Sequence, residues 1–169
     1  MEITIREAIP DDAEQLVPFV QRLAEEPGLY IIMGPGEFTL TVEEERQVLA
    51  DYAAADNSIF LVAEVEGRIV GVLNCKGGKR RAKRHEAVLG TSVAREWRGK
   101  GVGKRLMARV IKWARGTGII TRIELVVFFR NEVARHLYES FGFEVEGRLR
   151  RAVLRDGEYH DNLVMGLLL

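Results

Sequence analysis

Residues 95–106, with the sequence REWRGKGVGKRL, constrain the fold more than any other stretch of the chain. Gly99, Gly101 and Gly103 alternate with other residues, after a strand-like segment at 86–94 and at the start of a segment with apolar residues at helical spacing (Val102, Leu106, Val110 and Trp113). The first N–H groups of a helix lack partners within the helix, and the helix dipole adds positive charge there. Glycines let a phosphate approach such N–H groups closely. The stretch therefore predicts a phosphate-binding loop between a strand and a helix, and a glycine-rich turn with solvated charges is the alternative.

Two well-known phosphate loops do not fit these glycines. A Walker loop needs two glycines five positions apart and then Lys and Ser or Thr, but Arg98 stands at the first glycine position and Arg105 at the hydroxyl position. In a dinucleotide loop of the form G-x-G-x-x-G, the third glycine falls on Lys104 or on Leu106, depending on the register. The loop is therefore predicted to hold a phosphate in another way.

The rest of the chain predicts one α+β domain over residues 1–169. The expected order is strand, helix, helix, strand, strand, strand, helix, strand, helix, strand and strand, which forms a mixed sheet with helices on both faces. The first half of the chain is expected to hold a strand over 2–7, a helix introduced by residues 10–12 with apolar residues at helical spacing from 13 to 23, a loop at 25–38, a helix capped by Thr41 and Glu44 and ending near 54, and two strands within 58–75 that turn at 66–67. The second half is expected to hold a basic connector at 76–85, a strand at 86–94, a helix to about 115, a strand at 118–129, a helix from 131 to 142, and strands at about 143–154 and 158–168 that turn at Arg155–Glu158.

Composition narrows the class of protein. The chain carries 25 basic and 25 acidic residues, which argues against a dedicated nucleic-acid-binding protein. The connector at 76–85 is basic but has no aromatic residue to stack on a base, so a solvated arm is the favoured interpretation. Cys75 is the single cysteine and is expected in the core. No signal peptide, membrane span or paired metal ligands are recognised, and a cytoplasmic enzyme without a metal is expected.

A second motif follows the strand at 118–129. Residues 131–147 read NEVARHLYESFGFEVEG and match the pattern N-x-x-A-x-x-L-Y-x-x-x-G-F. Asn131 is a good helix N-cap, and Gly142 is suited to end the same helix. Tyr138 lies on the apolar face of this helix, where a buried hydroxyl needs a partner. These structural roles alone could account for the motif.

Together, the two motifs resemble those of the GNAT superfamily, the acetyl-CoA-dependent N-acetyltransferases, whose loop has the form R/Q-x-x-G-x-G/A. The resemblance implies a mostly antiparallel sheet and acetyl-CoA as co-substrate. Its pyrophosphate would lie on Arg98, Gly99, Lys100, Gly101, Val102, Gly103 and Lys104. The backbone of Thr91, Ser92 and Val93 would pair with the pantetheine arm, with an N–H near Val93 facing the thioester oxygen. Asn131 would also reach the cofactor, and Tyr138 would donate a proton to the departing thiolate.

The acceptor is expected to be a primary amine that attacks the thioester directly. The C-terminal stretch 142–168 is similar to the subgroup that acts on amino acids or protein N-termini. This places the acceptor over the 26–40 loop and the 154–160 turn, where His160 either lines the acceptor pocket or lies on the surface. The sequence leaves the oligomeric state open, with a homodimer as one option.

The general base is the part that the sequence leaves open. Many members of this superfamily carry a glutamate at positions that match Ala87 or Val88, or Val126, and this chain has none there. Glu124, Glu86, His85 and ordered water remain as candidates, and Glu124 can equally be a strand residue paired with a neighbouring arginine. The missing carboxylate supports one alternative function, a non-catalytic acyl-CoA-binding sensor or partner module.

Overall fold

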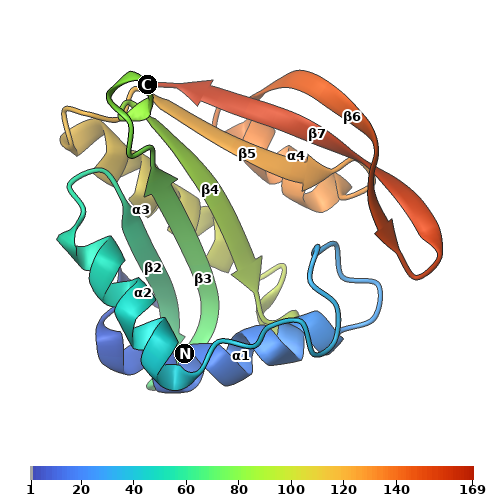
Figure 1. The fold of residues 1–169 in the computed structure, drawn as a ribbon, viewed down its shortest axis with the longest axis horizontal. Coiled ribbons are helices and arrows are strands. Elements are labelled where there is room, and N and C mark those ends of the chain that lie inside the picture. The colour runs from blue at the N-terminus through green and yellow to red at the C-terminus, as the bar shows by residue number, and fades with distance from the viewer. Residues whose placement is uncertain (1) are drawn as a thin grey trace.

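The computed structural model describes residues 2–169 and has the predicted order of elements (Figure 1). Its helices and strands are β1 (Thr4–Glu7), α1 (Ala13–Glu25), α2 (Val42–Ala54), β2 (Ile59–Val65), β3 (Arg68–Gly77), β4 (Glu86–Val93), α3 (Val102–Gly116), β5 (Arg122–Phe128), α4 (Glu132–Ser140), β6 (Glu144–Arg155) and β7 (Glu158–Leu168). The strands form one sheet in the order β1-β2-β3-β4-β5-β7-β6. Neighbouring strands are antiparallel except for β4 and β5, which are parallel.

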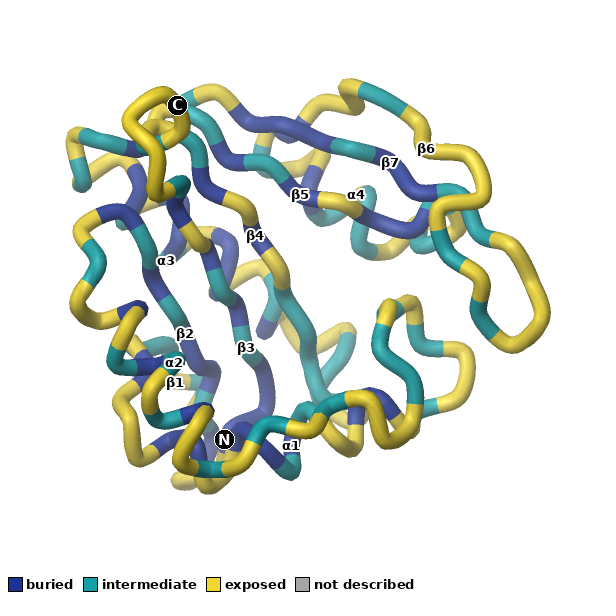
Figure 2. The backbone as a smooth tube through the Cα atoms, viewed as in Figure 1, coloured by how far each residue is buried: buried dark blue, intermediate teal, exposed yellow. Residues whose placement is uncertain are grey.

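Helices cover both faces of the sheet, and each face has its own apolar cluster. The larger cluster joins α3 and Tyr138 of α4 to the strands and includes Leu106, Met107 and Ile123. The smaller cluster joins α1 and α2 to β2 and β3 and includes Leu16, Phe19 and Leu49. Buried residues run through β2, β3, β5 and much of β7, whereas β6, its turn into β7 and the loop after α1 are exposed or half-buried (Figure 2). The predicted α+β arrangement is confirmed.

Local sequence signals account for the turns and one helix start. Glu66 and Gly67 between β2 and β3, and Asp156 and Gly157 between β6 and β7, all have positive φ, as two-residue type I′ hairpin turns require. α2 starts at the predicted capping box, in which Thr41 Oγ1 accepts a hydrogen bond from the Glu44 N–H at 3.2 Å and the Thr41 N–H donates to Glu44 Oε2 at 2.8 Å.

One strand is shorter than the sequence predicts. The apolar run at 118–129 suggested a single strand, but β5 covers only Arg122–Phe128. Oγ1 of Thr117 accepts hydrogen bonds from the N–H groups of Ile119 and Ile120 at 3.1 and 3.0 Å. These bonds hold both residues in the connection from α3, so the side-chain cap overrides their β propensity.

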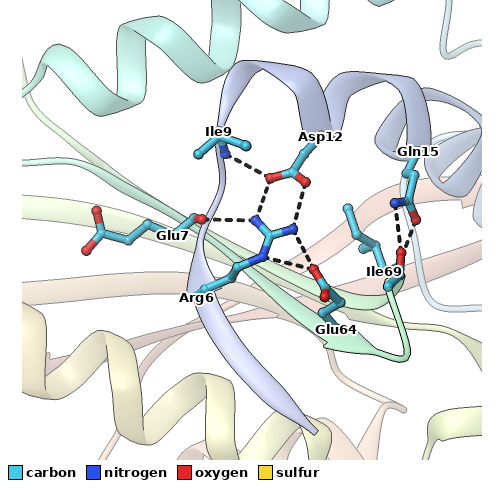
Figure 3. Close-up of polar contacts among 8 residues, drawn as sticks. Arg6, Glu7, Ile9, Asp12, Gln15, Glu64 and Ile69 are labelled. Carbon is cyan, nitrogen blue, oxygen red and sulfur yellow. Dashed lines mark hydrogen bonds and ion pairs between the residues drawn. The ribbon is translucent and has the colours of Figure 1, made fainter.

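An arginine in β1 ties the start of α1 to the sheet (Figure 3). Arg6 donates to both carboxylate oxygens of Asp12, at 2.7 and 2.8 Å, and to Glu64 of β2 at 2.6 Å. Asp12 also accepts the N–H of Ile9 at 2.8 Å. Burial acts to raise the pKa of Asp12, but the hydrogen bonds from Arg6 and Ile9 outweigh it and lower that pKa below its ordinary 3.8.

None of the helices in residues 2–169 is both long and apolar enough to cross a membrane.

Candidate functional site

The sheet opens between β4 and β5. These strands pair only over Glu86–Val88 and Arg122–Glu124, and beyond that point β4 stays with β3 while β5 stays with β7. The divergence is visible in Figure 1, where the two strands share one end and separate toward the other. Backbone groups on the open edge of β4 therefore have no strand beside them.

The hydrogen-bond alternation of β4 shows which peptide groups face the opening. The Ala94 N–H donates to the Val70 carbonyl at 2.9 Å, so Ala94, and with it Ser92, directs its peptide groups toward β3. Thr91 and Val93 then direct theirs away from β3, into the divergence. The structure thus separates the three residues predicted to bind the pantetheine arm. The peptide groups of Thr91 and the N–H of Val93 face the open side, whereas the Val93 carbonyl accepts a hydrogen bond from Arg98 and the backbone of Ser92 is used within the sheet.

A single 3-10 turn, Arg95–Trp97, follows β4, and the glycine loop then leads from Arg98 to the start of α3. Gly99 and Gly101 have φ of +72° and +82°, and a Cβ on either would meet no atom within 4 Å, so both positions face open space. α3 starts at Val102, and the first bond back to the loop is from Arg105 N to Gly101 O at 3.1 Å. The N–H groups of Val102, Gly103 and Lys104 precede that bond, so they have no carbonyl partner within the helix. Open space and free donors fit a phosphate.

Gly103 serves a different purpose from its two neighbours. A Cβ at this position would lie 3.2 Å from Cδ2 of Leu137, closer than ordinary packing allows. The glycine therefore lets α3 approach α4, which brings the two sequence motifs together. Val102 is buried beneath the loop and anchors it to the core.

The basic side chains of the loop differ in their partners. Arg98 donates from Nε to the Val93 carbonyl at 2.9 Å and forms an ion pair with Glu26 at the end of α1, with Nη2 to Oε2 at 2.7 Å. The hydrogen bond from Arg98 lowers the pKa of Glu26 below its ordinary value. Lys100 lies over the ring of Trp97, 4.9 Å from its centroid, and Lys104 forms no ion pair with the residues described. In this structure Arg98 holds α1 to the loop, and the two lysines remain to meet an anion.

Tyr138 and Asn131 lie on α4, beside the start of α3. Tyr138 is 7% exposed and packs in the larger apolar cluster, and burial raises the pKa of its hydroxyl to about 12. No hydrogen bond joins this hydroxyl to another residue of the described chain. Asn131 is the N-cap of α4, with Oδ1 accepting the Ala134 N–H at 3.2 Å. The capping role is observed, and the tyrosine hydroxyl keeps its proton and has no protein acceptor.

The carboxylates that the sequence offers as bases are engaged elsewhere. Arg122 donates to Glu124 at 2.8 Å and to Glu146 at 2.6 Å, and its Nε lies 3.5 Å from Glu86. Glu86 also accepts from Lys83 at 2.8 Å, and this hydrogen bond lowers the pKa of Glu86. These ion pairs gather at the closed end of the divergence, where β4 and β5 still pair. His85 is exposed at the same end.

A cavity of about 220 Å³ lies at the opposite, open end. The loop after α1 forms one side, the ends of β5 and β6 and the start of β7 form the other, and the lining residues are Gly28, Leu29, Tyr30, Phe128, Arg130, Arg155, Asp156, Glu158 and His160. Arg155 holds the loop in place through the Ile31 carbonyl. The cavity joins the two segments over which the sequence places the acceptor.

Several residues around these sites have no signal in the sequence. Glu26 meets Arg98 across 72 positions, and Tyr30 stacks near Phe128 with ring centroids 5.5 Å apart. Both contacts depend on how the loop after α1 folds across the sheet, which no local pattern encodes.

Among residues 2–169, no group of three or more His, Cys, Asp or Glu side chains is placed to hold a metal ion. Cys75 is fully buried, and burial raises its pKa to about 12, as a core residue requires.

Comparison with known proteins identifies the family. A model of the Acetyltransferase (GNAT) family matches residues 24–143. An acetyltransferase of the GNAT family from Streptococcus pneumoniae, solved as a crystal structure, is 34% identical, with a TM-score of 0.95 over 99% of both chains. The chain therefore belongs to the GNAT acetyltransferase family, and the predicted resemblance and fold are confirmed.

The chain is also similar to individual N-acetyltransferases and to a solved acetyltransferase structure. The L-amino acid N-acetyltransferase AaaT of Escherichia coli (strain K12) is 37% identical over 62% of this chain and 65% of its own length. The [Ribosomal protein uS5]-alanine N-acetyltransferase of the same organism is 30% identical over 60% of this chain and 52% of its own length. The matches thus span about two thirds and about half of these relatives. YncA of Salmonella typhimurium, solved with its cofactor acetyl-CoA, has the same fold, with a TM-score of 0.87 at 20% identity over 100% of this chain and 95% of that chain.

Proposed function

We propose that this protein transfers the acetyl group of acetyl-CoA to a primary amine by direct attack of the amine on the thioester. The observation that carries the proposal is the break in the sheet. Thr91 and Val93 leave peptide groups without a strand partner, and the glycine loop with its free N–H donors follows after a single 3-10 turn. An extended amide-containing arm that ends in a pyrophosphate matches this order of unpaired strand edge and anion site.

In this proposal, one group of residues binds the cofactor and another takes part in the chemical step. The N–H groups at the start of α3, with Lys100 and Lys104, hold the pyrophosphate, and Thr91 and Val93 pair with the pantetheine arm. The N–H near Val93 donates to the thioester oxygen as negative charge develops on it. Tyr138 donates to the sulfur as the bond to carbon breaks, which its buried and protonated hydroxyl suits. Asn131 positions the start of α4 beside the cofactor.

The acceptor that we propose is an α-amino group, either of a free amino acid or of a protein N-terminus. Two observations support this class. The cavity at the open end carries both signs of charge, with Arg130 and Arg155 beside Asp156 and Glu158. The relatives named above act on an L-amino acid and on the alanine of a ribosomal protein. We also keep a cytoplasmic location and a homodimer as proposals.

Release of CoA thiol tests the transfer. Purified protein with acetyl-CoA is offered the free L-amino acids, a tetrapeptide with N-terminal alanine, and simple amines such as ethylamine. We expect thiol release with at least one α-amine. The variant Tyr138→Phe should lower kcat by about 100-fold while leaving acetyl-CoA binding within twofold.

The alternative function, a non-catalytic sensor, makes the opposite prediction. A sensor binds acetyl-CoA but releases no thiol with any member of the panel, and Tyr138→Phe then changes nothing that the assay measures. No turnover across the whole panel, with acetyl-CoA binding intact, would therefore reject the proposed transfer.

A further inference from the structure

Two neighbouring side chains on β7 carry buried polar atoms without partners. Nδ1 of His160 and Oδ1 of Asn162 are both sealed from solvent, and neither has a hydrogen-bond partner among residues 2–169. Asn162 as a whole is only 6% exposed. The two residues are two positions apart on one strand, so their side chains stand on the same face of the sheet. Buried polar atoms of this kind are normally satisfied, and an orphaned pair is unusual.

The chemistry of the two atoms makes them complementary. A side-chain amide oxygen only accepts hydrogen bonds, whereas a neutral imidazole carries a donor on one nitrogen and an acceptor on the other. Because Oδ1 only accepts, a direct hydrogen bond between the two atoms after a side-chain rotation requires the hydrogen on Nδ1. The lone pair of His160 then resides on Nε2, and Asn162 determines the tautomer.

The imidazole is held at the cavity rather than on the open surface. Its ring centroid lies 5.6 Å from that of Phe128 and 6.5 Å from that of Tyr30, both in edge-on arrangements. All three residues line the cavity at the open end of the divergence. Nε2 makes no hydrogen bond to any residue that the structure describes. The nitrogen that carries the lone pair is thus left free at this cavity.

Measured along the strands, the cavity lies at the same height as the part of β4 that is proposed to meet the thioester. Val88 is paired with Glu124, and four residues farther along each strand are Ser92 and Phe128. Phe128 is in turn paired with Asn162. His160 and Asn162 therefore stand across the divergence at the height of Thr91 and Val93, whereas Glu86 and Glu124 stand at its closed end.

We propose that His160, with Asn162 as its positioning residue, is the general base that takes a proton from the acceptor amine. The proposal rests on the acetyl transfer proposed above and fills the role that the sequence left open. Nε2 takes one proton from the ammonium and later releases it to solvent. The freed nitrogen attacks the carbonyl carbon, a C–N bond forms and the C–S bond breaks. The second proton of that nitrogen reaches the sulfur by way of Tyr138, so the products are the amide, the CoA thiol and one proton.

Charged groups surround the imidazole from each packed element. Arg130 at the end of β5 is paired with Glu158 of β7 at 2.6 Å. Arg155 of β6 lies 3.6 Å from Asp156 in the turn, and Tyr30 comes from the loop after α1. The cavity that His160 lines therefore carries two arginines and two carboxylates.

Kinetics of His160→Gln provide the first test, with the acetyl-CoA and α-amine panel above. A positioned base contributes about 100-fold or more, so kcat/KM for the amine should fall by at least that factor, while KM for acetyl-CoA stays within twofold. The dependence of kcat/KM on pH should differ between the wild-type protein and the variant, because the variant must rely on amine that is already deprotonated in solution. His136→Gln, an exposed histidine on α4, is the matched control and should behave as wild type.

A variant that retains wild-type kcat/KM and the wild-type dependence on pH would overturn the proposal. The imidazole nitrogen spectrum is the second test and needs no turnover. In ¹⁵N-labelled protein above pH 8, His160 should show a hydrogen on Nδ1, and Asn162→Leu should shift it toward a mixture of tautomers. A hydrogen on Nε2 in the wild-type protein would reject the assigned pair. If no amine supports turnover, the transfer proposal fails and the spectrum alone decides the role of Asn162.

Discussion

At the scale of single residues, Gly101 shows how backbone geometry and the proposed anion site depend on each other. It is the N-cap of α3 and has φ of +82°, a conformation that residues with a Cβ adopt only with strain. The open space around it means that a substitution acts through this strain rather than through a clash.

Gly101→Ala should therefore lower the free energy of unfolding by about 1–2 kcal/mol, measured by urea denaturation, and weaken acetyl-CoA binding because the loop N–H groups shift. Gly116 at the end of α3 provides the control. It also faces open space, but its φ is not positive, so Gly116→Ala should be neutral or stabilising by about 0.5 kcal/mol. Equal destabilisation by both variants would contradict an effect that is specific to the positive φ of Gly101.

Residue-level sequence analysis succeeded where the information is local. The glycine spacing, the Thr41 capping box and the Asn131 cap depend on neighbours within four positions. His160 was left with two interpretations because its environment comes from segments more than 30 residues away, Phe128 and Tyr30. Arg98 was expected to meet phosphate, and its partner Glu26 could not be anticipated from 72 positions away.

At the scale of elements, the network around Arg6 fixes α1 against β1 and β2 and so fixes where the loop after α1 begins (Figure 3). The pKa of Asp12 is lowered in the folded state. Its contribution to stability is therefore fully present above the pKa of an unfolded aspartate, about 3.9, and is lost as the pH falls through the folded pKa.

Asp12→Asn should reduce the free energy of unfolding at pH 7 by about 2 kcal/mol, because it removes charged hydrogen bonds from Arg6. Urea denaturation across pH measures this. The gap between wild-type protein and variant should begin to narrow below about pH 4, where the unfolded state takes up a proton on Asp12, and should narrow further as the pH falls through the lowered folded pKa. A gap that stays constant down to pH 2 would show that packing, not charge, supplies the stabilisation.

Element boundaries were predicted closely where turns carry their own signal, as at Glu66–Gly67 and Asp156–Gly157. The strand at 118–129 was predicted too long because Thr117 caps the N–H groups of Ile119 and Ile120. A side-chain hydrogen bond of this kind competes with the ladder and is not visible in the hydrophobic pattern.

At the scale of the whole molecule, the opening between β4 and β5 provides the site that we propose for acetyl transfer. The sequence predicted the elements and, through the resemblance, their class. It did not predict that the strands part after Val88 and Glu124, because strand pairing is a property of distant segments. The glycine loop lies on the β4 side of this opening, and the cavity lined by His160 lies on the β5–β7 side.

Calorimetric titration of the protein with acetyl-CoA tests the central claim most directly, because every proposed role depends on this cofactor occupying the opening. We expect one site per chain with a Kd of about 1 mM or tighter, which corresponds to about −4 kcal/mol or more favourable. We also expect weaker binding in Gly101→Ala. The absence of binding at millimolar acetyl-CoA to folded wild-type protein would contradict the account.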